Sequence, residues 1–246
     1  MFRQFGLIGE KLGHSFSKKY FSKKFEAQDI DAAYELYELA EIGEFEKLKK
    51  TPHLRGLNVT IPYKAAVIPF LDELAPEAAA IQAVNTIKFE DGKLIGFNSD
   101  IYGFWNSLLD FTKGAEISGA IILGNGGATR AVIYVLEEKL GVKNIRIATR
   151  NPRSANHLSY PELESLEIEK FPLIINSTPL GMYPNTEGCP TFPYHKLSEK
   201  HWAYDLIYNP EETSFMRAAA KHGARSKNGI DMLIGQAEKS WEFWNS

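Results

Sequence analysis

A lysine stands just beyond the end of an apolar run in the stretch GLNVTIPYK, residues 56–64. A lysine in a cleft can donate a proton to a carbonyl oxygen that gains negative charge, and it can take the proton back in the reverse direction. Asp100 follows another apolar run in GFNSD, and a carboxylate beside the lysine would orient its ammonium group. Because surface lysines on the first turn of a helix are common, the spacing alone leaves both interpretations of Lys64 open.

Further polar residues stand just past apolar runs in the first half of the chain: Ser15 and Ser17 in HSFS, Asn58 and Thr60 in NVT, and Asn85 in VNT. The two serines share a face if the chain is extended there, since side chains alternate along an extended strand. Hydroxyls and amides suit a polyhydroxylated ring that carries a carboxylate. Taken singly, each residue is better explained as a helix cap or a turn residue, and Asp100 as an N-cap. Their repeated position at strand ends, where open α/β sheets bind ligands, favours a site.

A glycine cluster between a predicted strand and a predicted helix carries a second kind of chemistry. In IILGNGGATRA, residues 121–131, it consists of Gly124, Gly126 and Gly127. Glycines there allow a tight turn and let a pyrophosphate approach the backbone, and the following helix start offers N–H donors. Thr129 stands where the G-x-G-x-x-G/A fingerprint has its third small residue. The alternative is a purely structural turn, but the position between strand and helix favours a nucleotide site.

The end of the next predicted strand indicates which nucleotide. NAD-binding domains carry an acidic residue about 20 positions after the glycines, which bonds the ribose 2′-hydroxyl. This chain has ATRNPRS instead, with Arg150 and Arg153. Two guanidinium groups could bind a 2′-phosphate, so the pattern predicts NADP rather than NAD. A solvated basic turn is the alternative.

The elements that must position these residues follow from the alternation of apolar runs and helical periodicity. We predict strands over residues 5–8, 33–39, 57–61, 84–90, 93–97, 118–123, 144–148, 173–176 and 203–207, and helical segments over 18–27, 42–50, 64–71, 77–81, 128–139 and 231–244. Asp91-Gly92 between two of the strands predicts a hairpin. The alternation elsewhere predicts parallel βαβ units and therefore an α/β fold, with a domain boundary near residues 100–103.

Composition narrows the classes of function. The chain has 246 residues, of which 44% are hydrophobic and 24% charged, and a net charge of −3, which describes a soluble globular protein. The slightly acidic balance favours neither nucleic acid nor an anionic membrane as a partner. The single cysteine excludes an internal disulfide, so a cytoplasmic protein is expected. No metal is expected, since the histidines are not paired at ligand spacing, and His14 beside the serines is expected to be structural.

Several motifs occur in a fixed order along nearly the whole chain: HSFS, GLNVTIPYK, AVNT, GFNSD, GNGGATRA, NSTPLGM, DLIYNPEET and NGIDMLIGQAEKSWEFW. Together they resemble the shikimate dehydrogenase family, for which NVTxPxK and GxxMLxxQA are specific. The resemblance implies NADPH-dependent reduction of 3-dehydroshikimate to shikimate in aromatic amino acid biosynthesis. It implies a substrate domain of residues 1–101 and 229–246 and a Rossmann-like NADP domain of residues 102–228, with a cleft between them.

The resemblance also implies a role for individual residues. Lys64 would be the catalytic acid and base, with Asp100 beside it. The residues that would hold the substrate are Ser15, Ser17, Thr60, Asn85, Tyr208 and Gln236. Those that would hold the cofactor are Gly124, Gly126, Gly127 and Ala128 under the pyrophosphate, Thr149, Arg150, Asn151 and Arg153 around the adenosine phosphate, and Leu206, Gly229 and Met232 along the nicotinamide.

Two alternatives remain beside this function. One is a quinate/shikimate dehydrogenase that uses NAD, which Arg150 and Arg153 disfavour. The other is a non-catalytic NADP-binding relative, which the retained lysine and aspartate disfavour because a pure binder needs no proton donor. The sequence leaves both a monomer and a homodimer open.

Overall fold

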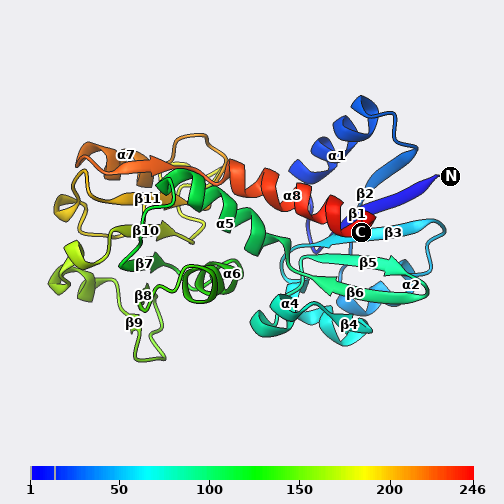
Figure 1. Ribbon diagram of the computed structural model, residues 1–246, viewed down its shortest axis with the longest axis horizontal. Coiled ribbons are helices and arrows are strands. Elements are labelled where there is room, and N and C mark those ends of the chain that lie inside the picture. Colours follow the sequence, from blue (N-terminus) through cyan, green and yellow to red (C-terminus); the bar gives the residue numbers. More distant parts are fainter. Residues whose placement is uncertain (1, 14) are drawn as a thin grey trace. The chain divides into compact units, whose positions relative to one another are not determined.

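The computed structural model describes residues 2–13 and 15–246 (Figure 1), so the expectation for His14 lies outside the described residues. The chain forms two compact units, residues 1–99 with 237–246 and residues 100–236. It passes from one unit to the other within the helix α5, Ser99–Thr112, and again within the C-terminal helix α8, Ile230–Asn245.

The first unit is built on a mixed sheet. Its strands are β1 (Arg3–Gly9), β2 (Ala32–Glu38), β3 (Leu54–Val59), β4 (Glu73–Leu74), β5 (Thr86–Glu90) and β6 (Lys93–Phe97), in the order β2-β1-β3-β5-β6-β4. The strands β1, β2 and β3 are parallel, whereas β5 runs antiparallel to both β3 and β6. The predicted βαβ units and the hairpin are therefore confirmed. Asp91 and Gly92 in the hairpin turn have φ angles of 49° and 80°, as a tight turn between twisted strands requires.

Helices cover both faces of this sheet. They are α1 (Phe16–Ala27), α2 (Phe45–Leu48), α3 (Tyr63–Ala66), α4 (Pro76–Ile81) and the last turns of α8. Phe5 of β1 joins an aromatic cluster with Phe21 of α1 and Trp244 of α8, and Ile8 joins the aliphatic core of the opposite face. A Cβ atom on Gly56 would lie 2.3 Å from Nε1 of Trp244. Glycine at the start of GLNVTIPYK thus lets α8 pack directly on β3.

The second unit has a fully parallel sheet. Its strands are β7 (Gly119–Leu123), β8 (Asn144–Ala148), β9 (His157–Leu158), β10 (Leu173–Asn176), β11 (Trp202–Asp205) and β12 (Arg225–Lys227), in the order β12-β11-β10-β7-β8-β9. The chain order reverses between β7 and β10, which is where such sheets bind ligands. The apolar strands β7 and β10 are buried throughout, as expected of strands covered on both faces.

Helices of the second unit include α6 (Thr129–Tyr134), which continues as a π-helical turn over Val135–Lys139, and α7 (Ser214–Lys221). The first turns of α8 lie against α5. A Cβ atom on Gly103 would lie 2.4 Å from the carbonyl oxygen of Met232, so glycine at this position allows the two helices to touch. The described helices include none that is long and apolar enough to cross a membrane.

The alternative that Ser15 caps a helix is confirmed. Ser15 has extended backbone angles and is the N-cap of α1, where its hydroxyl accepts a hydrogen bond from the Lys18 N–H at 3.4 Å. Ser17 lies within the first turn of the helix and is buried. The N-cap hydrogen bond stabilises a helix start, and it takes precedence over the alternation that a strand would have imposed. Asp100 is the second residue of α5 rather than its N-cap.

Candidate active site

Backbone hydrogen bonds bring three of the predicted site residues to one edge of the first unit's sheet. The N–H of Val59 donates to the carbonyl of Asn85 at 2.8 Å, just before Thr60. The N–H of Val84, the neighbour of Asn85, donates to the carbonyl of Lys64 at 2.7 Å. Since β3 ends where the antiparallel β5 begins, Thr60, Lys64 and Asn85 lie at the same edge.

Asn85 is held with one orientation of its amide. Its Oδ1 accepts hydrogen bonds from the N–H of Ser99 at 2.7 Å, from the Ser99 hydroxyl at 3.2 Å and from the Thr86 hydroxyl at 3.0 Å. The oxygen therefore points into the unit. Within the described chain, Nδ2 of Asn85 has no hydrogen-bond partner, and it is the atom that remains for a ligand.

Ser17 and Asn58 belong to the same polar interior. The Tyr34 hydroxyl donates to Oδ1 of Asn58 at 2.8 Å. Burial raises the pKa of Tyr34, and a hydrogen bond with Ser17 opposes that rise. Asn58 is buried and its side chain bonds only inward, whereas Thr60, two residues further on, is partly exposed at the strand end. The two residues that sequence alternation puts on one face thus differ in what they can contact.

Asp100, Tyr208 and Gln236 lie in the second unit. Asp100 and Gln236 are 9% and 8% exposed, and each is on a helix, α5 and α8 respectively. Tyr208 follows β11 and is 38% exposed, and partial burial raises its pKa.

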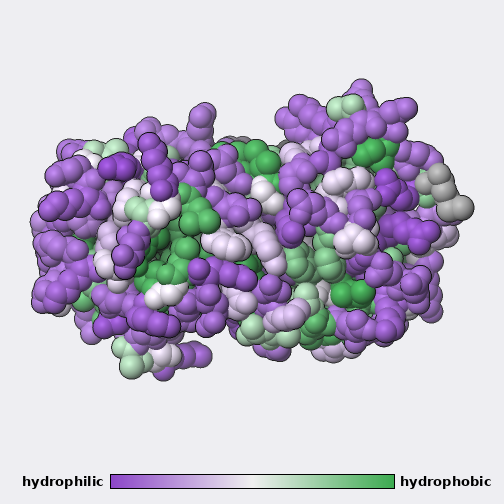
Figure 2. Space-filling model, in the orientation of Figure 1, coloured by the Kyte–Doolittle hydropathy of each residue, from purple (hydrophilic) through white to green (hydrophobic). Residues whose placement is uncertain are grey.

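A cavity of about 570 Å³ opens at the glycine turn of the second unit. It is lined by Gly124, Asn125, Gly126, Thr149, Arg150, Asn151, Tyr160, Ser177, Thr178, Pro179, Leu180 and Thr191. Predicted cofactor residues from two different strand ends, β7 and β8, therefore meet in one cavity. Figure 2 shows apolar side chains gathered over the second unit within a mostly hydrophilic face.

Gly124 and Gly126 contribute to this turn in different ways. Gly124 has φ +99°, and a Cβ atom there would lie 2.8 Å from Cγ2 of Thr178, so the fold itself demands glycine. At Gly126 the nearest atom to an added Cβ is the Ser177 carbonyl oxygen at 3.7 Å, which is an ordinary contact. The fold would accept a side chain at Gly126. Its absence leaves space along the cavity, as close approach of a pyrophosphate requires.

Thr129, which stands at the position of the fingerprint's third small residue, makes hydrogen bonds within the turn. Its buried hydroxyl accepts a hydrogen bond from the Gly126 N–H at 3.0 Å and lies 2.8 Å from the Ser177 hydroxyl. The side chain thus ties the turn after β7 to the segment after β10. The threonine that departs from the sequence fingerprint therefore supplies hydrogen bonds that shape the turn.

The three residues predicted along the nicotinamide lie close together. A Cβ atom on Gly229 would be 2.3 Å from the carbonyl oxygen of Leu206, so the two backbones touch. The N–H of Gly229 donates to the carbonyl of Ile207 at 2.9 Å, and buried Met232 follows in the first turn of α8. Arg153, in contrast, is not among the residues that line the cavity. Its backbone N–H donates to Nδ1 of His157 at 3.2 Å.

The structure adds residues that the sequence predictions did not include. Ser177 and Thr178 line the cavity directly after β10, and their position at the end of an apolar strand was the available signal. Tyr160 lines it beside Arg150; burial raises the pKa of Tyr160 and the nearby guanidinium opposes that rise. No local pattern distinguishes Tyr160 from any other loop tyrosine.

A buried carboxylate, Asp205, organises the ends of β10 and β11. Its Oδ1 accepts from Asn176 Nδ2 and from the Ile207 N–H, both at 3.0 Å, and its Oδ2 accepts from the Thr213 hydroxyl at 2.6 Å. Burial raises the pKa of Asp205 to about 6, and the three hydrogen bonds act against that rise. The group precedes Leu206 and so fixes the backbone that Gly229 contacts.

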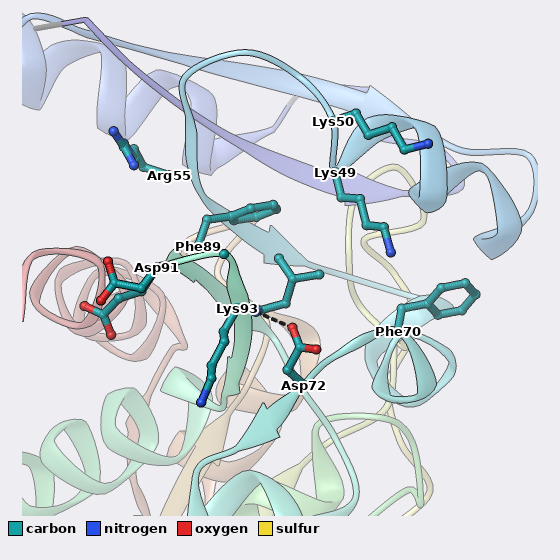
Figure 3. Close-up of a pocket in the computed structure, with 11 residues that line it drawn as sticks. Lys49, Lys50, Arg55, Phe70, Asp72, Phe89, Asp91 and Lys93 are labelled. Carbon is teal, nitrogen blue, oxygen red and sulfur yellow. Dashed lines mark hydrogen bonds between the residues drawn. The ribbon is translucent and has the colours of Figure 1, made fainter.

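The first unit has a cavity of its own, about 420 Å³, whose lining includes none of the predicted substrate residues (Figure 3). Its walls combine the rings of Phe70 and Phe89 with cations and carboxylates of several elements. Two of the cations are neutralised locally, since Lys49 pairs with Glu46 at 2.8 Å and Lys93 pairs with Glu73. This mixed surface offers no defined ligand chemistry. Among the described residues, no group of three or more His, Cys, Asp or Glu could hold a metal ion.

Comparison with known proteins gives one consistent result. Residues 7–87 match the family profile of the shikimate dehydrogenase substrate binding domain. The chain is 40% identical to the NADP⁺ shikimate dehydrogenase of Clostridium perfringens strain SM101, over 98% of this chain and 92% of that protein. A shikimate dehydrogenase crystallised with NADP⁺ superimposes with a TM-score of 0.89 at 32% identity, over 98% and 89% of the two chains. The shikimate dehydrogenase of Thermus thermophilus, in complex with NADP(H) and shikimate, superimposes with a TM-score of 0.84 at 28% identity, over 98% of this chain and 93% of that chain.

Proposed function

Because the chain belongs to the shikimate dehydrogenase family, we propose that Lys64 and Asp100 are the residues that move and direct the proton in its reaction. The protein is an NADP-dependent oxidoreductase that reduces 3-dehydroshikimate to shikimate, reversibly, in aromatic amino acid biosynthesis. NADPH, when bound, supplies the hydride for the carbonyl carbon. Lys64 protonates the carbonyl oxygen as it gains charge, and in the reverse direction it removes the hydroxyl proton.

The remaining polar residues hold the ring. Asn85 presents Nδ2 as a donor, because its Oδ1 is occupied by Ser99 and Thr86. Thr60 lies at the same sheet edge as Lys64, and Ser15, Ser17, Tyr208 and Gln236 complete the set of hydroxyls and amides. Asp100 bonds a neighbouring substrate hydroxyl and orients the ammonium of Lys64. In this proposal residues 1–101 and 229–246 form the substrate domain, and residues 102–228 form the cofactor domain.

The cavity at the glycine turn suits NADP. Gly124, Gly126, Gly127 and Ala128 accommodate the pyrophosphate, and Thr149, Arg150 and Asn151 surround the 2′-phosphate. Arg153 adds positive charge from outside the cavity lining. Leu206, Gly229 and Met232 form the surface on which the nicotinamide ring lies.

The observation that supports the catalytic assignment is the backbone pair that holds Lys64 beside Asn85, the Val84 N–H to Lys64 carbonyl bond at 2.7 Å. It fixes the start of the lysine side chain at the same edge as two predicted substrate groups. The proposal also places the enzyme in the cytoplasm and, given the net charge of −3, without a nucleic-acid partner.

The test is a spectrophotometric assay that follows cofactor reduction at equal concentrations of NADP⁺ and NAD⁺, with shikimate or quinate as substrate. We expect turnover with shikimate and NADP⁺ to exceed the other three combinations. A preference for quinate with NAD⁺ would contradict the assignment of Arg150, and tight NADP⁺ binding without turnover would contradict that of Lys64.

A further inference from the structure

Three buried hydroxyls from distant parts of the chain meet in the interior of the first unit. We call Thr86 of β5, Ser99 at the start of α5 and Ser240 of α8 the hydroxyl cluster. Their Oγ atoms are 3.2 Å apart for Thr86 and Ser99, 2.9 Å for Thr86 and Ser240, and 3.0 Å for Ser99 and Ser240. All three side chains are 0% exposed. Such a group is stable only if every hydrogen finds an acceptor.

The surrounding amides give this cluster a direction. The Tyr34 hydroxyl donates to Oδ1 of Asn58, so Nδ2 of Asn58 must donate, and it lies 2.9 Å from the Ser240 hydroxyl. The Ser240 hydroxyl in turn lies within bonding distance of Ser99 and Thr86. These two hydroxyls both lie within bonding distance of Oδ1 of Asn85, at 3.2 and 3.0 Å. One connected network thus runs from Tyr34 to Asn85.

This network ends on groups that serve the proposed reaction. It directs Oδ1 of Asn85 inward and so leaves Nδ2 for the ligand. It also fixes Ser99, whose N–H donates to Asn85 at 2.7 Å and whose neighbour in the first turn of α5 is Asp100. The position of a substrate-binding amide and that of a carboxylate therefore both depend on the same hydroxyls.

We infer that Ser240 is a positioning residue of the active site. It contacts neither substrate nor cofactor; it acts through Ser99 and Thr86 on the amide of Asn85 and on the start of α5. The inference rests on the proposed function of Asn85 and Asp100. A serine that only fills the core would affect stability alone, whereas a positioning serine must also change how the enzyme binds shikimate.

The test compares Ser240→Ala with Ser107→Ala. Ser107 is equally a buried serine, and its hydroxyl accepts a bond from Tyr204 at 2.7 Å, but it has no bond to the hydroxyl cluster. We expect both variants to lose stability. Ser240→Ala should raise the KM for shikimate about fivefold to tenfold, the effect of one neutral hydrogen bond, and leave the KM for NADP⁺ unchanged. Ser107→Ala should change neither KM. Ser240→Cys, which keeps the shape with a slightly larger atom but weakens the donor, replaces the alanine variant if that variant does not fold.

Two further variants separate the possible failures. If Ser240 acts in part through Asn85, the double variant Ser240→Ala with Asn85→Ala should weaken shikimate binding by less than the sum of the two single effects. Strictly additive effects, or an unchanged shikimate KM in both Ser240 variants while Asn85→Ala raises it, would overturn the inference and leave the proposed function intact. An unchanged KM in Asn85→Ala would refute the role of Asn85 itself and the inference with it.

Discussion

The polar edge of the first unit and the glycine turn of the second unit prepare for their ligands in opposite ways. In the first unit, side chains such as Asn85 are fixed by several internal hydrogen bonds and present one remaining atom. In the second unit, the main contribution of Gly126 is a missing side chain, which leaves space along a cavity that polar and apolar side chains line. A small ring with stereospecific hydroxyls requires fixed donors and acceptors, whereas a dinucleotide requires space for its pyrophosphate and a cation for its phosphate.

The largest expected effect concerns the first unit. Lys64→Ala should lower kcat by about 10²–10⁴-fold, because it removes the group that exchanges the proton. The KM for NADP⁺ should remain unchanged, since Lys64 lies outside the cofactor cavity. Steady-state kinetics in both directions provide the measurement, and a kcat within twofold of the native value would remove Lys64 from the mechanism.

In the second unit, the buried Asp205 resembles Asn85 of the first unit, because several internal hydrogen bonds hold its side chain. Its pKa of about 6 in the folded protein lies above the usual value near 3.8, so the native state binds more protons between about pH 4 and 6. The free energy of unfolding contributed by this group therefore falls as pH rises through that window, by at most about 3 kcal/mol.

Asp205→Asn should remove this contribution. Denaturant unfolding at pH 4, 5, 6 and 7 should show a stability difference between native and variant proteins that depends on pH. If the difference were constant over these values, Asp205 would titrate normally in the folded protein.

Substitution of Arg150 tests how much its positive charge contributes to cofactor binding in the second unit. Arg150→Ala should raise the KM for NADP⁺ about 10- to 100-fold, because a hydrogen bond to a charged group is worth about 1.5–3 kcal/mol. The KM for NAD⁺, which lacks the 2′-phosphate, should change little. Arg153→Ala is the matched control, and we expect a smaller effect because Arg153 does not line the cavity. Equal effects on the two cofactors would refute the 2′-phosphate assignment.

The smallest expected effect on activity concerns Gly126, which we compare with Gly124 of the same turn. Gly126→Ala should leave stability within about 0.5 kcal/mol of the native value, since the fold has room for the methyl group, but it should raise the KM for NADP⁺ severalfold. Gly124→Ala should destabilise the protein by about 1 kcal/mol or more, because φ is +99° and Thr178 is close. Thermal unfolding and cofactor titration of both variants give the comparison; identical behaviour would mean that the two glycines serve the same purpose.

Local patterns predicted most of the fold. The strands over residues 144–148 and 173–176 match β8 and β10 at both ends. The hairpin at Asp91-Gly92 and the glycine turn after β7 also follow from short-range chemistry, because a turn depends on the backbone angles of its own residues. The serines of HSFS show the limit: extended and helical conformations were both open there, and the N-cap bond of Ser15 determined the outcome.

The candidate site was predicted less completely, and the functions assigned to its residues stay predictions. Lys64, Asn85 and the glycines were found because each follows or precedes an apolar strand. Tyr160 was missed since it lies in a loop without a pattern. The sequence also could not show that Arg153 lies outside the cavity lining while Arg150 is within it.

The sequence by itself determined which segments are strands and helices, where the tight turns occur, and which polar residues stand at strand ends. Only the tertiary structure decided which of those polar atoms are consumed inside the protein and which remain for a ligand. The physical reason is the separation of the partners along the chain. Asn58 and Ser240 are 182 positions apart, yet their hydrogen bond helps to determine which way the amide of Asn85 points.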